Sequence, residues 1–370
     1  MRSTAIFIKF VAMKRIAILA ASLLLGASIC GAETIPASDS RATWIGRTEI
    51  SEDGSVSFDW SATTVRLKFS GTTLKLKCKD THADWFNLWV DTPQGPQATS
   101  VFKVAGDTTV TLFKGKKGVH EVSIQKRTEG EQGTAFFESF ATDGKFLDAP
   151  RSHSRLIEFI GDSYTCGYGT EAPDRNAPFL PETENPALTY ADIVARLFDA
   201  EAVHISHSGR GIVRNYGDFN QHENMVKLYA QTYDQHCEKA WTPTYTPDVV
   251  VIYLGTNDFS TGKQPNLDYW CSGYATLLRQ VRAFYGEQVP IILMASKANE
   301  LMGTYVMTAG ERSAVGNLHY CVIQPSAHNH DGDLGASWHP NYKGHRKIAS
   351  ILAPYIATVT GWDLPFKAYE

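Results

Sequence analysis

The chain has 370 residues, of which 43% are hydrophobic and 20% are charged, and its formal net charge is −4 at pH 7. This composition is that of a folded globular protein and excludes a disordered or collagen-like chain. The length is sufficient for two domains. No nucleic acid is expected as a partner, because binding to nucleic acid depends on neutralising phosphates with Lys and Arg side chains.

Residues 1–32 have the pattern of a signal peptide. Lys14 and Arg15 precede an uncharged, mostly apolar run over residues 16–29, and Cys30-Gly31-Ala32 follow. The run is shorter than the about 20 apolar residues of a spanning helix, whereas a basic start, a short apolar core and small residues at the cleavage site are typical of export. We expect a periplasmic or extracellular chain with no integral membrane segment after cleavage. Cleavage removes four basic residues and no acidic ones, so the formal charge becomes −8. A lipid on Cys30 is the alternative.

Residues 40–149 show the two-residue periodicity of β-strands. Apolar and polar side chains alternate in "SVSFDW" (55–60), "TTVRLKF" (63–69) and "TLKLKCK" (73–79), and glycines between such runs, as at Gly71 and in "FKGKKG" (113–118), are typical of turns. The pattern predicts an all-β sandwich of the jelly-roll type. The aromatic-rich "DWFNLWVD" could contact carbohydrate, but aromatic residues in strands more often form the core.

Residues 152–365 show a different periodicity, in which apolar strand-like runs alternate with amphipathic helical ones. The expected strands cover 156–160, 202–206, 249–254 and a run from 289, and the expected helices cover 187–200, 266–285 and the region after Pro340. Alternating strands and helices predict a parallel sheet covered on both faces, which is a three-layer α/β/α domain. Ligands of such domains bind at the carboxyl ends of the strands.

Four short segments fall at or near that edge of the predicted sheet. Ser163 of "GDS", Gly209 of "SHSGRG" and Asn257 of "GTND" each follow a strand, and His339 of "SWHP" precedes the final helix. A serine nucleophile needs a base to take its proton, and the tetrahedral intermediate of acyl transfer needs N–H donors aimed at its oxyanion. These residues supply all of these groups, so the sequence predicts acyl transfer.

The four segments, in this order, resemble the four sequence blocks of the SGNH (GDSL) hydrolases. The resemblance implies that Ser163 is the nucleophile, that Gly209 and Asn257 join the Ser163 N–H in the oxyanion hole, and that His339 is the base. The preceding sandwich, together with "GDSYTCGYG" and "SGRGIVRN", is similar to the second carbohydrate-esterase family. Enzymes of that family remove acetyl groups from xylan and related plant polysaccharides.

The sequence departs from one common feature of the SGNH hydrolases. Many of them have an aspartate three residues before the histidine, where this chain has Ala336. That acid orients the imidazole and stabilises the imidazolium. The carbohydrate-esterase family often uses a main-chain carbonyl instead, and the resemblance implies the carbonyl of Trp338 in this role. Asp331 or Asp333, on a loop with two glycines, is the alternative.

The resemblance implies a secreted carbohydrate O-acetyl esterase that acts on a plant polysaccharide such as xylan or glucomannan, so an acetylated oligosaccharide or polysaccharide is the expected partner. Trp338 is the candidate sugar-contacting residue. The alternatives are a lipase, a thioesterase, or a sialate or peptidoglycan acetylesterase with the same four residues, or a glycan-binding protein without activity. Acyl transfer by these residues needs no cofactor. No metal is expected, because His236-Cys237 has no second pair at ligand spacing.

Overall fold

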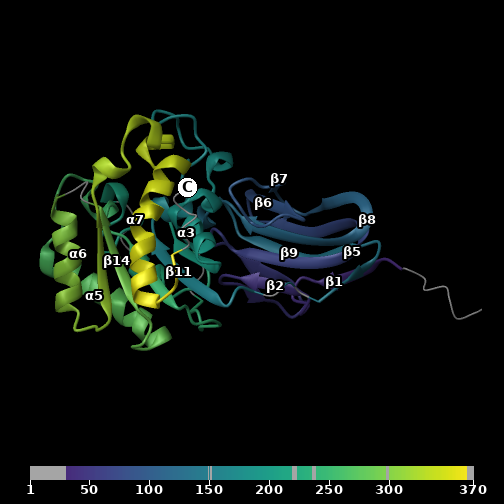
Figure 1. Ribbon diagram of the computed structural model, residues 1–370, viewed down its shortest axis with the longest axis horizontal. Coiled ribbons are helices and arrows are strands. Elements are labelled where there is room, and N and C mark those ends of the chain that lie inside the picture. The colour runs from purple at the N-terminus through teal and green to yellow at the C-terminus, as the bar shows by residue number, and fades with distance from the viewer. Residues whose placement is uncertain are drawn as a thin grey trace, which may run out of the picture.

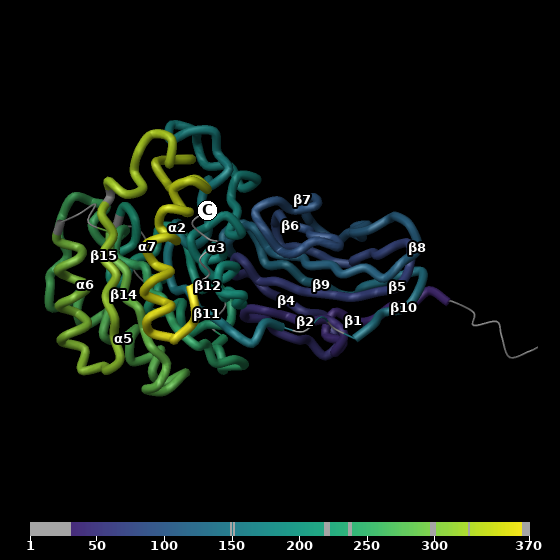
Figure 2. The backbone as a smooth tube through the Cα atoms, viewed as in Figure 1, coloured from purple at the N-terminus to yellow at the C-terminus, as the bar shows by residue number. Residues whose placement is uncertain are grey.

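The computed structural model describes residues 31–148, 150, 152–218, 223–235, 239–296 and 300–364. The predicted signal peptide, apart from its last two residues, and the pair His236-Cys237 lie outside the described residues. Figure 1 shows an antiparallel domain beside an α/β domain. In the backbone tube of Figure 2, the purple-to-blue first part of the chain builds the antiparallel domain and the rest builds the α/β domain. No helix within the described ranges is long and apolar enough to cross a membrane.

The N-terminal domain is an antiparallel sheet of ten strands around one hydrophobic core. The central order is β3-β4-β9-β5-β8-β6-β7, with β1 paired to β9 and with β2 and β10 paired to β5. Its strands are β1 (Glu33–Pro36), β2 (Ala42–Ile45), β3 (Glu49–Ile50), β4 (Val56–Phe58), β5 (Thr64–Asp80), β6 (Asp84–Val90), β7 (Ser100–Val104), β8 (Thr108–Lys126), β9 (Ala135–Thr142) and β10 (Lys145–Phe146).

Two of these strands are longer than the sequence pattern predicts. Gly71 lies inside β5 and residues 113–118 lie inside β8, so the turns expected at both places are wrong. The pairing of β5 with β8 instead shifts register between Gly71 and Thr73. An irregularity of this kind bends a strand without ending it, and glycine tolerates the bend. Most of the aromatic-rich β6 is core, because Phe86, Leu88 and Trp89 are buried.

The C-terminal domain contains a five-stranded parallel sheet in the order β12-β11-β13-β14-β15. Its strands are β11 (Arg155–Gly161), β12 (Ala200–Ser206), β13 (Val249–Tyr253), β14 (Ile291–Ser296) and β15 (Leu318–Ile323). Its α-helices are α2 (Ser163–Cys166), α3 (Tyr190–Leu197), α4 (Met225–Leu228), α5 (Leu267–Tyr285), α6 (Glu300–Arg312) and α7 (Tyr342–Thr360). Its 3-10 helices are η2 (Pro181–Thr183), η3 (Pro186–Leu188), η4 (Tyr216–Asp218), η6 (Asn257–Phe259), η7 (Pro325–Ala327), η8 (Asp331–Asp333) and η9 (Ala336–Trp338), whereas η1 (Gly130–Gln132) lies between β8 and β9 of the antiparallel domain.

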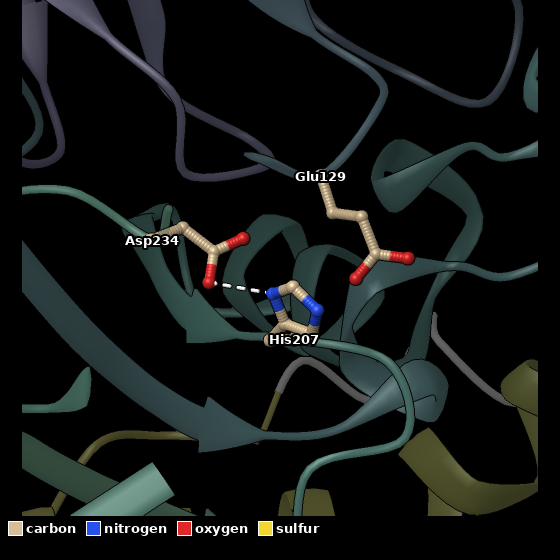
Figure 3. A group of neighbouring side chains, drawn as sticks. All are labelled: Glu129, His207 and Asp234. Atoms are coloured by element: carbon tan, nitrogen blue, oxygen red, sulfur yellow. Dashed lines mark hydrogen bonds and ion pairs between the residues drawn. The ribbon is translucent and has the colours of Figure 1, made fainter. Parts of the chain in front are cut away.

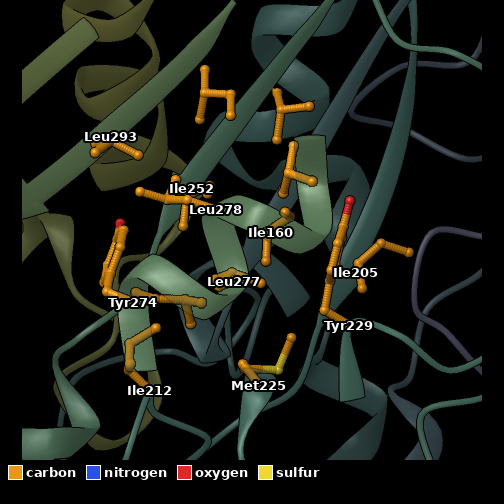
Figure 4. Close-up of a cluster of buried hydrophobic side chains, with 14 of the residues drawn as sticks. Ile160, Ile205, Ile212, Met225, Tyr229, Ile252, Tyr274, Leu277, Leu278 and Leu293 are labelled. Carbon is orange, nitrogen blue, oxygen red and sulfur yellow. The ribbon is translucent and has the colours of Figure 1, made fainter. Parts of the chain in front are cut away.

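Helices cover both faces of the parallel sheet, as its uninterrupted apolar strands require. Along β13, Val250 and Ile252 face the core that α5 and α6 cover, whereas Val249 and Val251 face the core that α3 and α7 cover. Figure 4 shows the first of these cores, in which Leu278 of α5 lies beside Ile252 of β13. The prediction of a three-layer α/β/α domain preceded by an all-β domain is confirmed.

The two domains share part of this core. Ile45 and Trp60 of the antiparallel domain belong to the same buried cluster as α5. Arg47 is fully buried, and its Nη1 donates hydrogen bonds to the carbonyls of Tyr229 and Gln231 at 2.5 and 2.7 Å. Its guanidinium carbon lies 3.8 Å from the centre of the Trp241 ring. The antiparallel domain therefore inserts side chains into the α/β domain instead of resting on its surface.

Candidate active site

The serine of the first motif stands at the start of a short helix that follows a buried strand. β11 ends at Gly161, and Asp162 caps α2 by accepting a hydrogen bond from the Tyr164 N–H at 3.2 Å. Ser163 is the first helical residue, and 7% of its surface is exposed. A helix N-terminus leaves backbone N–H groups without helical partners. Asp162 accepts from the N–H groups of Tyr164, Thr165 and Cys166, so within α2 only the N–H of Ser163 itself is left available beside the serine hydroxyl.

The loop after α2 contacts the loop that contains His339. The Gly169 carbonyl accepts a hydrogen bond from the Ala336 N–H at 3.2 Å. Gly169 has a φ of 58°, and a Cβ added there would lie 2.2 Å from the Cβ of Ala336. Glycine thus allows both the left-handed backbone and the close approach. This contact explains one of the glycines that surround the serine in the sequence.

Ser163 and His339 are in hydrogen-bond contact. The Oγ of Ser163 lies 2.8 Å from Nε2 of His339. On the other side of the ring, Nδ1 lies 3.1 Å from the Ser337 carbonyl and 3.2 Å from the Ala336 carbonyl. Because carbonyl oxygens only accept, Nδ1 must carry the proton. Nε2 is therefore the unprotonated nitrogen that can accept the serine proton.

A backbone carbonyl does face the imidazole, but the expectation that it belongs to Trp338 is wrong. Ser337 and Trp338 both have positive φ angles, 50° and 66°. These angles coil the chain tightly in η9, so the carbonyls of Ala336 and Ser337 turn toward the ring that follows them. The prediction of the Trp338 carbonyl assumed ordinary negative φ angles, which do not produce such a turn.

Neither nearby aspartate contacts His339. Asp331 pairs with Arg175 at 2.5 Å on the surface. Asp333 is buried and pairs with Lys347 of α7 at 2.6 Å, and this hydrogen bond together with the Lys347 charge lowers the pKa of Asp333 although burial acts in the opposite direction. Each carboxylate thus pairs with a basic side chain and not with the imidazole. The geometry corresponds to a serine-histidine dyad.

Gly209 and Asn257 lie at the carboxyl ends of β12 and β13, the two neighbours of β11. Among the described residues, neither the Gly209 N–H nor the Ser163 N–H donates a hydrogen bond. Nδ2 of Asn257 donates hydrogen bonds to the Arg210 carbonyl at 2.8 Å and to Oδ2 of Asp162 at 3.3 Å. The bond to Asp162 is the longer and therefore the weaker of the two. Its amide hydrogen is the one that would have to leave Asp162 to bind an oxyanion.

Asp258, next to Asn257, holds the loop of the second motif. Its carboxylate accepts hydrogen bonds from three successive backbone N–H groups, those of Ile212, Val213 and Arg214, at 2.8–3.0 Å. Burial nevertheless raises the pKa of Asp258 to about 6. The sequence did not predict this role of Asp258, because an aspartate after a strand does not reveal which loop it will contact.

An aromatic surface surrounds the imidazole. The rings of Tyr168 and His339 are 4.4 Å apart, and Tyr168 stacks on Phe179 at 4.1 Å. Trp338 is 55% exposed, and the guanidinium of Arg175 lies 4.1 Å from its ring centre. Trp338 therefore directly precedes His339 in the chain and keeps about half of its surface exposed, although Arg175 lies over its ring.

Within the part of the chain that the structure describes, two groups of buried side chains have donor atoms close enough together to hold a metal ion. They are Glu129, His207 and Asp234, and Glu129, Cys166 and Glu184. The ligand atoms of the first group already make hydrogen bonds, since Nδ1 of His207 lies 2.7 Å from Oδ1 of Asp234. The four cysteines in the described residues, Cys78, Cys166, Cys271 and Cys321, are free thiols.

Comparison with known proteins covers both domains. Residues 44–150 match the family described as "Carbohydrate esterase 2 N-terminal", and residues 159–347 match the "GDSL-like Lipase/Acylhydrolase family". The "Cellulase/esterase CelE" of Acetivibrio thermocellus is 32% identical over 86% of this chain, but this chain covers 39% of that protein. An "Acetylxylan esterase / glucomannan deacetylase" of Cellvibrio japonicus is 28% identical, with 83% of this chain and 87% of that protein covered.

A solved structure is similar over nearly all of the described chain. It is a family two carbohydrate esterase from Clostridium thermocellum in complex with cellohexaose, with 32% identity and a TM-score of 0.79. The comparison covers 87% of this chain and 100% of that one. Both domains and their arrangement are thus found together in another protein.

Proposed function

This chain belongs to the SGNH (GDSL) hydrolases, as a member of carbohydrate esterase family two, and we propose on that basis that it removes O-acetyl groups from a plant polysaccharide. The observation that carries this proposal is the 2.8 Å contact between Ser163 Oγ and the unprotonated Nε2 of His339. The relatives named acetylxylan esterase and glucomannan deacetylase support xylan or glucomannan as the substrate class.

In the proposed mechanism, Nε2 of His339 takes the Ser163 proton as Oγ attacks the acetyl carbonyl. The N–H groups of Ser163 and Gly209 and the Asn257 amide stabilise the oxyanion. The imidazolium then donates its proton to the sugar oxygen as the C–O bond breaks, which leaves an acetyl-serine. Water, deprotonated by His339, attacks the acetyl-serine, and its proton passes through Nε2 back to Oγ as acetate leaves.

Trp338 is the proposed sugar contact. Its exposed ring lies one residue from the base, and an aromatic face packs well against the apolar face of a pyranose ring. The cellohexaose in the related complex supports a glycan ligand for this fold. We also propose that the chain is exported, on the signal-peptide pattern of residues 1–32.

Wild-type protein is expected to hydrolyse a chromogenic aryl acetate and to release acetate from acetylated xylan or glucomannan. The measurement is acetate release from a panel that also contains acetylated sialic acid, acetylated peptidoglycan and a long-chain ester. Turnover of the aryl acetate and the sialate ester alone would contradict the proposed substrate. Absence of turnover on every ester, with binding to glycan retained, would favour the non-catalytic alternative.

The acid limb of the pH profile should lie well below the usual pKa of histidine. Burial lowers the pKa of His339 to about 4, although the two carbonyls act in the opposite direction. The base works in its neutral form, so kcat/KM should be retained as pH falls through 6.5 and be lost as pH falls through about 4. Circular dichroism at each pH is the control for unfolding.

A midpoint near 6.5 would show that His339 is solvated in the free enzyme. A midpoint near 7 would assign the limb to Asp162, because burial raises the pKa of that carboxyl to about 7. The two midpoints can be separated by repeating the profile on Asp162→Asn.

A further inference from the structure

A charged segment of the antiparallel domain is buried against the α/β domain. It comprises residues 126–130, "KRTEG", at the end of β8. The Nζ of Lys126 donates to Oδ1 of Asp84 at 2.7 Å, and the Nε of Arg127 donates to the Glu184 carbonyl at 2.9 Å. Bonds to both domains therefore fix the course of this segment.

The Glu129 side chain projects from this segment to the second motif. It is 1% exposed, and its Oε2 accepts a hydrogen bond from the Ser208 N–H at 2.6 Å. The Cys166 thiol, at the end of the nucleophile helix α2, donates to the same oxygen at 3.5 Å. Ser208 immediately precedes Gly209, the proposed oxyanion donor. A side chain of one domain thus binds the backbone that leads to the reaction centre of the other.

Asp234 makes the matching contact in the opposite direction. Its Oδ2 accepts a hydrogen bond from the Gly130 N–H at 2.9 Å, and its Oδ1 lies 2.7 Å from Nδ1 of His207. Figure 3 shows the His207 ring between the carboxylates of Asp234 and Glu129. Burial lowers the pKa of His207, but the two carboxylates outweigh it and raise the pKa to about 9. At neutral pH the His207 cation is therefore paired with Asp234 and also faces Glu129, whose own pKa is raised by burial.

The peptide unit between Ser208 and Gly209 is anchored on both sides. The Ser208 N–H is held by Glu129, and the Gly209 carbonyl accepts a hydrogen bond from the Tyr216 N–H at 2.7 Å. Gly209 has a φ of 75°. The direction of the Gly209 N–H depends on these anchors. A displacement of about 1 Å at a catalytic group can cost about 10²-fold in rate.

We propose that Glu129 of the antiparallel domain is a positioning residue of the oxyanion hole, which orients the Gly209 N–H by holding the Ser208 backbone. This inference rests on the proposed esterase function. It assigns the antiparallel domain a part in catalysis that does not require it to touch the polysaccharide.

The test compares Glu129→Ala, Glu129→Asp and Glu129→Gln on a chromogenic aryl acetate. Alanine removes the acceptor, and aspartate keeps the charge but withdraws the carboxylate by one methylene. Both should lower kcat by about 10- to 100-fold with KM nearly unchanged, because a displaced donor weakens transition-state binding. Glutamine keeps an acceptor oxygen and should recover most of the loss.

Glu201→Gln is the matched control. Glu201 is 4% exposed and also joins the domains, since it accepts from Arg66 Nη2 at 2.9 Å. It lies at the start of β12, whereas Ser208 follows the end of the same strand. Its kcat should stay within about twofold of wild type, as expected for a site remote from the reaction. An equal loss of kcat in this control would overturn the proposal, because any weakened junction would then have the same effect.

Hydrogen–deuterium exchange of the peptide that spans residues 205–212 tests the hydrogen bond from the Ser208 N–H to Glu129 without depending on enzyme activity. Exchange there should be at least about tenfold faster in Glu129→Asp than in wild type or Glu201→Gln. Unchanged exchange together with unchanged kcat in Glu129→Asp would overturn the inference, even if Glu129→Ala fails to fold.

If wild type cleaves aryl acetate but no polysaccharide, the proposed substrate fails while the Glu129 effect still stands. If wild type cleaves no ester, the proposed function fails, and the exchange comparison alone decides whether Glu129 anchors the loop.

Discussion

Replacing Ser163 with alanine is expected to lower kcat for acetate-ester hydrolysis by about 10⁴- to 10⁶-fold, which is the size of effect seen when a serine nucleophile is removed. The Ser163 Oγ is the atom that faces Nε2 of His339 at 2.8 Å. Without it no acetyl-serine can form, and the donors that remain can stabilise only the direct attack of water. The fold should persist, because alanine suits the first turn of a helix.

The measurement is kcat on aryl acetate and on acetylated xylan, with the melting temperature of each variant. Ser350→Ala serves as the control, since Ser350 is an exposed serine of α7 that bonds the Lys347 carbonyl. It should retain wild-type kcat. A folded Ser163→Ala protein with wild-type turnover would show that the nucleophile lies elsewhere.

Replacing Asn257 with alanine is expected to lower kcat by about 10²- to 10³-fold, the usual cost of one oxyanion donor. KM should change much less, because this donor acts on charge that develops in the transition state. Asn257 also holds the Arg210 carbonyl at 2.8 Å, so the loss includes some loosening of the second-motif loop.

Asn266→Ala is the control for this variant. Asn266 caps α5 by accepting a hydrogen bond from the Tyr269 N–H at 3.0 Å. Its loss should cost stability by about 1 kcal/mol, typical of an N-cap, without changing kcat. A rise in KM alone for Asn257→Ala would make Asn257 a substrate-binding residue and would contradict the oxyanion role.

The periodicity of the sequence predicted the two domain types and most of the parallel sheet. β11, β12, β13 and β14 lie within two residues of their expected positions, because strands buried on both faces are continuously apolar. The long strands β5 and β8 could not be predicted, because a glycine inside a bent strand has the same local pattern as a glycine in a turn. Continuity there depends on cross-strand partners far away in the sequence.

The four motif residues predicted from the sequence do meet at one edge of the sheet. Ser163, Gly209 and Asn257 follow strands that are neighbours in the order β12-β11-β13, so parallel pairing brings them together. Their roles stay predictions until the variants are measured. The carbonyl that faces His339 could not be assigned correctly, because two successive residues with positive φ have no reliable sequence pattern.

Glu129 could not be found from the sequence either. Charged residues in a row, as in "KRTEG", ordinarily predict a solvated loop. Here the charges are buried because the second domain covers them, and Lys126 and Asp84 compensate each other at 2.7 Å. Such burial arises only where the two domains meet, and the sequence pattern of either domain by itself does not predict it.

From the burial of Arg47 in the α/β domain, we expect the two domains to be inherited together. A chain from which the antiparallel domain was deleted would open the space between Tyr229 and Trp241 and would leave the fully buried Glu158 without the guanidinium that lies 3.9 Å away. Removing one partner of a buried ion pair typically costs about 3–5 kcal/mol, a large part of the stability of a domain. Accessory domains that recombine freely among enzymes are joined by exposed linkers with few contacts across the boundary. The boundary in this chain is instead a buried interface with many contacts. Gene rearrangements should therefore transfer the antiparallel domain and the hydrolase domain together.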